Sequence, residues 1–480
     1  MPNSLAYAAL LAWPLITVLL FRSLSFERAL IWSILGGYLL LPQQTAFDAP
    51  LIPPLDKSSI PNLAAFLMVV FGMGRKVPIF AGSPAVAALL VLFVASPVAT
   101  TLLNADAFRV GAVMVEGRPP ADALAHLIRQ AIFLLPFFLA RQYLATQAAQ
   151  REILLALAVG GLAYSLPMLL EIRLSPQLHI WVYGFFPHAF DQQMRFGGFR
   201  PMVFLSHGLF VAFFAFTAVV AAFGLWRADR GRGGGAYLPA GGYLSVVLVL
   251  CKSVGAVLYA VVAIPLVLFA GRRAQVLVAA TLAAVVIAYP VLRGADLIPV
   301  ETMIAQAKSF DAERSESLAY RLRNEAAVLA RAQERPVFGW GGGVRNAILF
   351  DPTAPEERQV THAVLDGRWI IVISIFGWCG YIVEFGLLAL PLLMLAWRVR
   401  RIPAAQISPY IGPTALILGF NMFELLPNSA LIPFTWLLAG AILGHAESLA
   451  RSGKAPDPAS GPARAGAGPA RPAPQIKTVL

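Results

Sequence analysis

The sequence is poor in charged residues and contains almost no cysteine. Asp, Glu, Lys and Arg make up 13% of its 480 residues, whereas soluble domains carry about 25%. This shortage excludes an ordinary water-soluble domain, which needs charged side chains to cover its surface. The two cysteines, Cys251 and Cys379, lie in apolar runs without the spacing of metal ligands. A disulfide framework and a zinc-binding fold are therefore excluded as well.

The chain is instead rich in hydrophobic residues, which make up 58% of it. Its mean hydropathy is +0.71. Many apolar runs approach the ~20 residues that cross a ~30 Å hydrocarbon core. The sequence therefore predicts an all-α polytopic membrane protein in a lipid bilayer, with about 12–14 transmembrane helices. We place about thirteen spans near residues 5–21, 29–41, 61–74, 84–103, 124–140, 151–170, 201–226, 237–250, 255–270, 274–292, 369–397, 409–426 and 430–447.

A polar insert separates these runs into two blocks. Residues 1–292 and 369–447 form the transmembrane blocks, residues 293–368 form the insert, and residues 448–480 form a tail. The tail is rich in Pro, Gly and Ala and has no apolar periodicity, so we expect it to be disordered. A protein that only spans the membrane has no need of such an insert, which points to chemistry at the membrane surface.

Basic residues mark one side of the predicted membrane protein. The formal net charge of +12 would suggest a nucleic-acid partner in a soluble protein. Here the excess lies in every second loop, as the positive-inside rule requires of cytoplasmic loops. We therefore expect no nucleic-acid partner, a cytoplasmic tail, and an insert on the outer side. The basic loops contain Arg22 and Arg28; Arg75 and Lys76; Arg141 and Arg151; Arg227, Arg230 and Arg232; Arg272 and Arg273; and Arg398, Arg400 and Arg401.

The insert contains a segment with the pattern of an amphipathic helix. From Ser315 to Glu334 there is neither Gly nor Pro, and leucines and alanines recur at a spacing of three to four residues. Glu325 follows Arg321 by one helical turn, so the two side chains can pair. Pro336 ends the helix. This helix either contributes to a site or serves only as a structural cover.

A second polar patch, His179–Gly208, precedes the seventh span. It contains Arg195, Arg200 and His207, with Gly197 and Gly198 between the two arginines. Arginines at a membrane face suit a phosphate ligand, because the guanidinium binds oxyanions through two parallel hydrogen bonds. Lys252 lies at an outer turn and breaks the positive-inside pattern. It either binds phosphate as well or extends its ammonium to the membrane interface.

The order of these elements resembles that of the O-antigen ligase and polysaccharide polymerase family of bacterial inner-membrane proteins. The stretches that carry the resemblance are Arg195–Phe199, Lys252–Ala256, Arg321 with Pro336–Gly341, and Gly377–Gly380. Glu325 stands where many members have Trp. Asp366 holds the register of the family's polar site, and the nearest histidine, His362, lies four residues earlier.

The resemblance implies a C-type glycosyltransferase that uses no metal and no nucleotide sugar. Such an enzyme moves a glycan from undecaprenyl pyrophosphate to an acceptor glycan, with the large loop in the periplasm. Other polysaccharide export proteins are further partners that the resemblance suggests. It implies catalytic roles for Arg321 and for either Asp366 or His362 as the base. The substrate-binding residues that we expect are Arg195, Arg200, Arg323, Lys252, His207 and Arg368.

Two other functions remain open at the level of sequence. A flippase of lipid-linked glycans is one, since Glu384 and Glu424 lie in apolar runs where acids often serve transport. A non-catalytic scaffold of an export complex is the other. Asp366 also has a simpler interpretation, as the cap of the helix that follows it.

Overall fold

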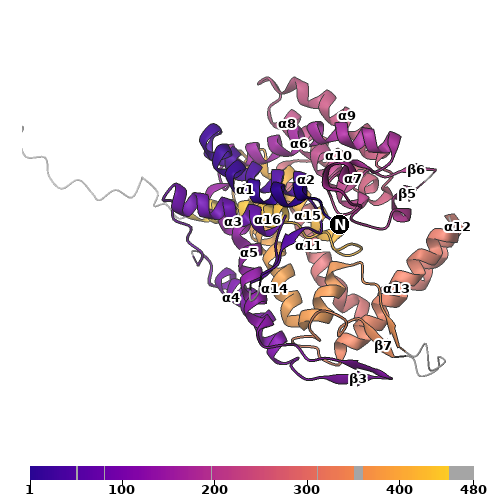
Figure 1. The fold of residues 1–480 in the computed structure, drawn as a ribbon. Helices are drawn as coiled ribbons and strands as arrows, with labels where there is room; N and C mark the ends of the chain where they lie inside the picture. The colour runs from indigo at the N-terminus through magenta and orange to yellow at the C-terminus, as the bar shows by residue number, and fades with distance from the viewer. Residues whose placement is uncertain (50–51, 81, 196, 311, 351–359, 453–480) are drawn as a thin grey trace, which may run out of the picture.

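The computed structural model describes residues 1–49, 52–80, 82–195, 197–310, 312–350 and 360–452, and it is mostly helical. Figure 1 shows the helices gathered in one bundle, with short strands at its edges. The helices of the first block are α1 (Ser4–Ser23), α2 (Phe26–Leu40), α3 (Ser59–Leu67), α4 (Pro84–Leu102), α5 (Asp122–Tyr143), α6 (Gln147–Leu174), α7 (Leu178–Tyr183), α8 (Gly208–Ala228), α9 (Tyr237–Leu250), α10 (Val254–Phe269) and α11 (Arg272–Gly294). The later helices are α12 (Val300–Phe310), α13 (Ala312–Gln333), α14 (Arg368–Val399), α15 (Ile411–Glu424) and α16 (Pro433–Ser452).

The long apolar helices are compatible with a polytopic membrane protein. Within the described residues, seven helices are long and apolar enough to cross a bilayer: α1, α4, α5, α6, α8, α11 and α14. Three shorter apolar helical segments, 59–72, 234–250 and 254–269, accompany them. Each run that we expected to span coincides with a helix, but the 12–14 expected spans exceed the seven that reach full length. The difference arises because helices such as α2 and α15 have only 15 and 14 residues.

The centre of the bundle is α8, which packs against α6, α9 and α10; 89% of the residues in its most apolar stretch are buried. A second packed group joins α5 with α16, α11 with α15, and α14 with α4 and α16. Trp436 on α16 is fully buried, and its ring lies edge-on to Phe93 and Phe137, 5.4 Å and 6.3 Å away between centroids. These contacts form a continuous core across the two blocks of sequence.

The basic loops are joined to one another by side-chain contacts at one end of the bundle. Arg28 binds Glu152 at 2.7 Å, and the Arg75 guanidinium lies 3.8 Å from the centroid of the Phe26 ring. Further contacts connect Arg151 with Asp229, Asp229 with Tyr410, Arg227 with Val267, Arg272 with Ile407, and Arg273 with Val399. The alternation of basic loops in the sequence thus corresponds to a shared face in three dimensions.

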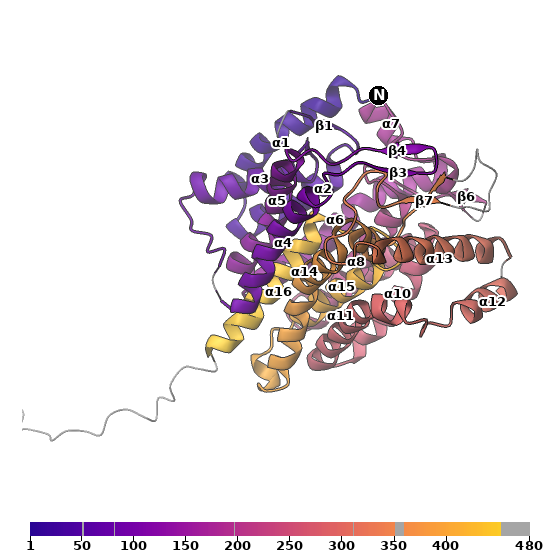
Figure 2. The ribbon, with the colours of Figure 1, turned by 90° about the horizontal axis from the view of Figure 1, so that it is seen from below.

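Short antiparallel hairpins and the helices of the insert lie outside the bundle. The hairpins pair β1 (Ala46–Phe47) with β2 (Leu55–Asp56), β3 (Phe108–Val110) with β4 (Val113–Val115), β5 (Met194–Arg195) with β6 (Gly198–Phe199), and β7 (Ile348–Phe350) with β8 (Val360–His362). Both views place α12 at the outer edge of the molecule, beyond α13 (Figures 1 and 2). The helix expected from Ser315 to Glu334 is α13, and it packs against α14 and β7.

One segment of the insert joins the backbone of α14. This helix breaks at Gly377, where φ is 66° and ψ is −167°, and residues 336–341 enter the break. In an uninterrupted helix the backbone N–H groups of Trp378 and Cys379 would donate to the carbonyl oxygens of Ser374 and Ile375. Here these two N–H groups and two carbonyls form hydrogen bonds with the backbone of the insert instead. The bonds run from Trp340 N to Ser374 O (2.9 Å), Gly341 N to Ile375 O (2.9 Å), Trp378 N to Pro336 O (2.8 Å) and Cys379 N to Val337 O (3.1 Å).

Two glycines permit this close approach. Gly339 has a φ of 67°, and a Cβ there would lie 2.5 Å from the carbonyl carbon of Ile375. A Cβ on Gly377 would collide in turn with the backbone of Val337. The two glycine motifs of the sequence, Pro336–Gly341 and Gly377–Gly380, are therefore two halves of one junction.

The boundaries of the insert and of the tail differ from the expected ones. Helix α11 continues to Gly294, past the expected start of the insert at residue 293. Helix α16 continues to Ser452, although the tail was expected to begin at residue 448. The remainder of the expected tail, residues 453–480, lies outside the described residues.

Candidate functional site

A cavity of about 680 Å³ opens between the insert and the helical bundle. Its walls come from segments far apart in the sequence: the β5–β6 hairpin and the loop that leads to α8, the start of α10, the middle of α13, the segment before α14, and the turn after α15. Five of the residues predicted from the sequence line it, namely Arg195, Arg200, His207, Arg321 and Asp366.

The arginines give this cavity an excess of positive charge. Arg195, Arg200 and Arg321 line it. The Arg200 side chain is buried, with 5% of the residue exposed, and its Nε finds no hydrogen-bond partner among the described residues. Burial, together with the charges of Arg195 and Arg321, lowers the pKa of Arg200 to about 10. A buried guanidinium with an unused donor and cationic neighbours favours an anionic ligand.

Arg321 and Asp366 form an ion pair inside the cavity. Arg321 Nε lies 3.1 Å from Asp366 Oδ2, and the side chains are 43% and 34% exposed. The prediction that Arg321 pairs with Glu325 is wrong. Among the described residues, the ion-pair partner of Arg321 is Asp366. Capping does not explain Asp366 either, because the N-cap of α14 is Gly367 and no side chain caps it. The carboxylate is therefore held by an arginine beside open cavity space.

Histidine side chains add hydrogen-bond donors to the same wall. His207 is the N-cap of α8, and its Nδ1 accepts a hydrogen bond from Leu209 N at 3.0 Å. Burial and the charge of Arg200 lower the pKa of His207 to about 3, so the ring is neutral at pH 7. Since Nδ1 accepts, the proton of the neutral ring sits on Nε2. The His188 ring packs edge-on against it at 4.8 Å. His207 is therefore suited to donate a hydrogen bond rather than to take up a proton.

Three further residues line this cavity: Glu424, which the sequence offered only as a possible transport residue, and Tyr259 and Tyr320, which sequence reasoning missed. Glu424, at the end of α15, accepts hydrogen bonds from Tyr259 Oη and Asn428 Nδ2, each at 2.7 Å. Tyr320, one residue before Arg321, lines the same wall. Glu424 stood out in the sequence as an acid in an apolar run, but not as a neighbour of the predicted arginines. Tyr259 lies within an apolar run and carries no signal in the sequence.

The remaining predicted residues lie outside the cavity lining. The Lys252 Nζ lies against Gly198, close enough that a Cβ there would collide with it. Arg323 is exposed on α13. Arg368 binds Glu384 through two hydrogen bonds of 2.7 Å and 2.6 Å and lines a different cavity. His362 is exposed on β8, opposite Ile348. Residues 363–367 are not helical, so His362 and Asp366 do not lie on one helical turn.

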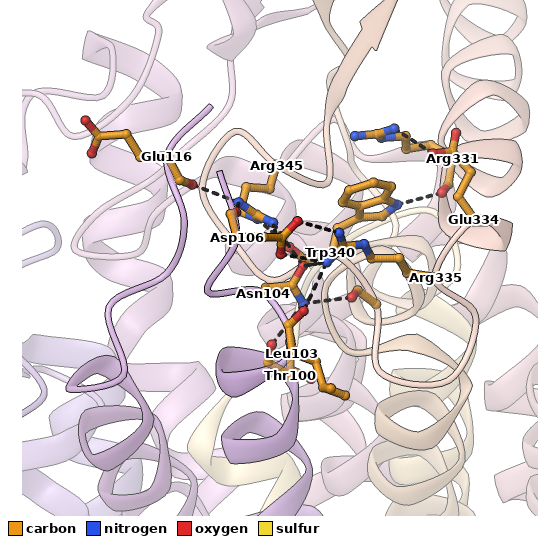
Figure 3. A network of polar contacts seen from close by, with 11 residues as sticks. Thr100, Leu103, Asn104, Asp106, Glu116, Arg331, Glu334, Arg335, Trp340 and Arg345 are labelled. Atoms are coloured by element: carbon orange, nitrogen blue, oxygen red, sulfur yellow. Dashed lines mark hydrogen bonds and ion pairs between the residues drawn. The ribbon is translucent and has the colours of Figure 1, made fainter. Parts of the chain in front are cut away.

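A polar network fixes the insert to the segment after α4. Figure 3 shows the Asp106 carboxylate between Arg335 and Arg345. Arg335 Nη2 donates to Asp106 Oδ2 at 2.8 Å, and this hydrogen bond holds the pKa of the Asp106 carboxyl below its usual range. Asn104 Oδ1 accepts from both arginines, at 2.7 Å and 3.2 Å. Both the Arg331 and the Arg335 guanidinium lie on the Trp340 ring. The network joins the end of α13 to the segment after α4.

In the described part of the chain, no three His, Cys, Asp or Glu side chains are grouped closely enough to hold a metal ion. The expectation that the reaction needs no metal stays a prediction. Comparison with models of known protein families gives no match. Comparison with curated proteins gives no significant match either.

Proposed function

We propose that this protein transfers a glycan from a lipid pyrophosphate to a hydroxyl group of an acceptor sugar. The observation that carries the proposal is the meeting of Arg195, Arg200 and Arg321 with Asp366 in one cavity. Fixed cations are what a departing pyrophosphate needs, because negative charge develops on its oxygens as the glycosidic bond breaks. A carboxylate beside them can take the proton of the attacking hydroxyl.

The reaction has a balanced form that uses these residues. The acceptor hydroxyl oxygen attacks the anomeric carbon, and the bond from that carbon to the pyrophosphate oxygen breaks. The hydroxyl proton passes to the Asp366 carboxylate, and the pyrophosphate leaves with the bonding electron pair. Arg195, Arg200 and Arg321 stabilise the charge on the leaving group. The Nε2–H of His207 offers a further donor to the same oxygens.

The same proposal covers the family, the location and the partners. The chain would act as an O-antigen ligase or polysaccharide polymerase of the C-type glycosyltransferase kind in a bacterial inner membrane. Its insert would lie in the periplasm, and undecaprenyl pyrophosphate would carry the donor glycan. The grouping of the basic loops at the opposite end of the bundle supports this orientation.

The test separates transfer from transport. Purified protein in lipid vesicles is given an undecaprenyl-pyrophosphate-linked oligosaccharide and an acceptor glycan. We expect free undecaprenyl pyrophosphate and an extended acceptor, both lost in Arg200→Gln at equal protein level. A flippase would move the lipid-linked glycan between leaflets without breaking the glycosyl bond. That outcome, or an unchanged rate in Arg200→Gln, would refute the proposal.

A further inference from the structure

A second cavity, of about 360 Å³, adjoins the first. Ser429, in the turn between α15 and α16, lines both cavities. The segment before α14 helps to divide them: Asp366 lines the first cavity and Arg368 the second. The proposed reaction uses only the first cavity, so the second has no role yet. Its size is within the roughly 300–1,000 Å³ of small-molecule sites.

Arginines from two neighbouring segments give the second cavity cationic groups. Arg118, in the loop before α5, and Arg129, on α5, line it together with Arg368. Arg368 is neutralised by Glu384, which also lines the cavity. Among the described residues, the ion pair of the Arg118 guanidinium is a long one, with 3.6 Å between its Nη1 and Asp122 Oδ2. The Arg129 guanidinium lies over the Phe133 ring, 5.6 Å from its centroid. Both guanidiniums can thus contribute to binding an anion.

Two residues of this lining carry donors without partners. Arg118 Nε is buried without a hydrogen-bond partner among the described residues, and so is Trp436 Nε1. Trp436 is 0% exposed, yet it lines the cavity. Both groups can only donate hydrogen bonds. A buried donor without an acceptor is costly, so the pair favours a ligand rich in oxygen acceptors.

Aromatic rings form another part of the wall. Phe93 and Trp436 are buried and lie edge-on at 5.4 Å between ring centroids, and Phe133 and Phe376 also line the cavity. Apolar ring faces suit the C–H face of a sugar, and the arginine fork suits a carboxylate. A lipid tail would use the rings but would leave the arginines and the unused donors without partners.

We infer that the second cavity binds an acidic saccharide. This saccharide would be the end of an acceptor glycan that carries carboxylate groups. This inference rests on the proposed function for the role of acceptor, but binding itself can be measured without transfer. Because the two cavities meet at Ser429, an acceptor held in the second one can present a hydroxyl toward Asp366 in the first.

The test measures the two cavities separately by titration of purified, detergent-solubilised protein. We expect an oligogalacturonate to bind, and an uncharged galacto-oligosaccharide of equal length to bind much less. Arg118→Gln should weaken oligogalacturonate binding about tenfold or more and leave inorganic pyrophosphate binding unchanged, which also shows that the variant is folded. Arg200→Gln should do the reverse. Arg109→Gln, an exposed arginine on β3 outside both linings, should change neither.

Three outcomes would overturn the inference: unchanged oligogalacturonate binding in Arg118→Gln, loss of pyrophosphate binding instead, or displacement of the oligogalacturonate by phosphatidylglycerol. The last result would assign the cavity to a lipid headgroup. If the wild-type protein binds oligogalacturonate but no pyrophosphate, the proposed function fails while the acidic-saccharide site stands.

Discussion

Arg321 Nε lies 3.1 Å from Asp366 Oδ2, so the residue proposed to hold the leaving group is paired with the residue proposed to take the proton. A phosphate oxygen that binds Arg321 competes with Asp366 for the same guanidinium. Donor binding would then release the carboxylate when an acceptor hydroxyl needs it. The ion pair thus connects the two halves of the proposed reaction.

Replacing Arg321 by lysine tests the role of the guanidinium. Arg321→Lys keeps the charge but loses the two parallel hydrogen bonds of the guanidinium. We expect a loss of roughly 2–4 kcal/mol of transition-state stabilisation and a correspondingly slower transfer. The measurement is the rate at saturating donor. Arg323→Lys, on the same helix but outside the cavity lining, should retain the rate. Equal damage in the two variants would argue for a structural effect on α13.

The identity of the base is tested by Asp366→Asn and His362→Ala. Asn keeps the size and polarity of Asp366 but cannot take the proton, so we expect normal protein levels and transfer about 10²–10⁴-fold slower. His362 is exposed on β8, and its replacement should leave the rate near that of the wild type. Full activity of Asp366→Asn with an inactive His362→Ala would move the base to the histidine.

The junction between the insert and α14 is tested by alanine at its glycines. Gly339→Ala and Gly377→Ala place a Cβ against backbone at positive φ, which costs on the order of 1–3 kcal/mol each. We expect a lower melting temperature in detergent and less protein in the membrane. Gly242→Ala is the control, since no atom lies within 4 Å of the added Cβ. Equal stability of all three variants would contradict this account of the junction.

The buried carboxyl of Glu325, on α13, should make the stability of the protein depend on pH. Burial raises the pKa of this carboxyl to about 7, so in the folded protein it stays protonated where the unfolded chain has lost its proton. Stability should therefore fall as the pH rises from about 4.5 to 7 and then level off. Glu325→Gln should flatten this profile and raise stability at pH 8 by about 1–2 kcal/mol. Thermal unfolding of the wild type and of Glu325→Gln between pH 4.5 and 8 measures the two profiles. Identical profiles of the two proteins would count against the burial of this carboxyl.

The orientation of the insert is tested by cysteine labelling. Val344 is 50% exposed in the insert, and Arg232 is exposed at the end that carries the basic loops. In a variant without Cys251 and Cys379, an impermeant maleimide should label Val344→Cys in outer-permeabilised cells. It should label Arg232→Cys only after lysis of the inner membrane. The reverse pattern would invert the topology and remove the proposed function.

The sequence predicted the helices well because hydrophobic runs and helix formers are local signals. Helix α13 begins and ends near the expected residues, and every expected span coincides with a helix. Lengths were less predictable, since a run such as that of α15 ends as a helix at Glu424 and continues as a turn at residues 425–427. Pairing was least predictable: Arg321 has a suitable partner one turn away in Glu325, but the fold gives it Asp366.

The candidate site was predictable where its residues are charged. Arg195, Arg200 and Arg321 stand out in an apolar chain, and the cavity gathers all three. The second cavity was not predictable, because Trp436 and Phe93 look like ordinary core residues in the sequence. Their position beside Arg118 depends on the packing of α4, α5 and α16, which no local pattern encodes.

The break in α14 also has a consequence for how the chain assembles. A membrane helix usually completes its backbone hydrogen bonds alone, and an unsatisfied group in hydrocarbon costs several kcal/mol. In α14, Ser374, Ile375, Trp378 and Cys379 depend on residues 336–341 for theirs. These residues are synthesised before α14, so they have to be in position when the helix settles. A chain without the insert would thus fail at biogenesis, before any question of activity arises.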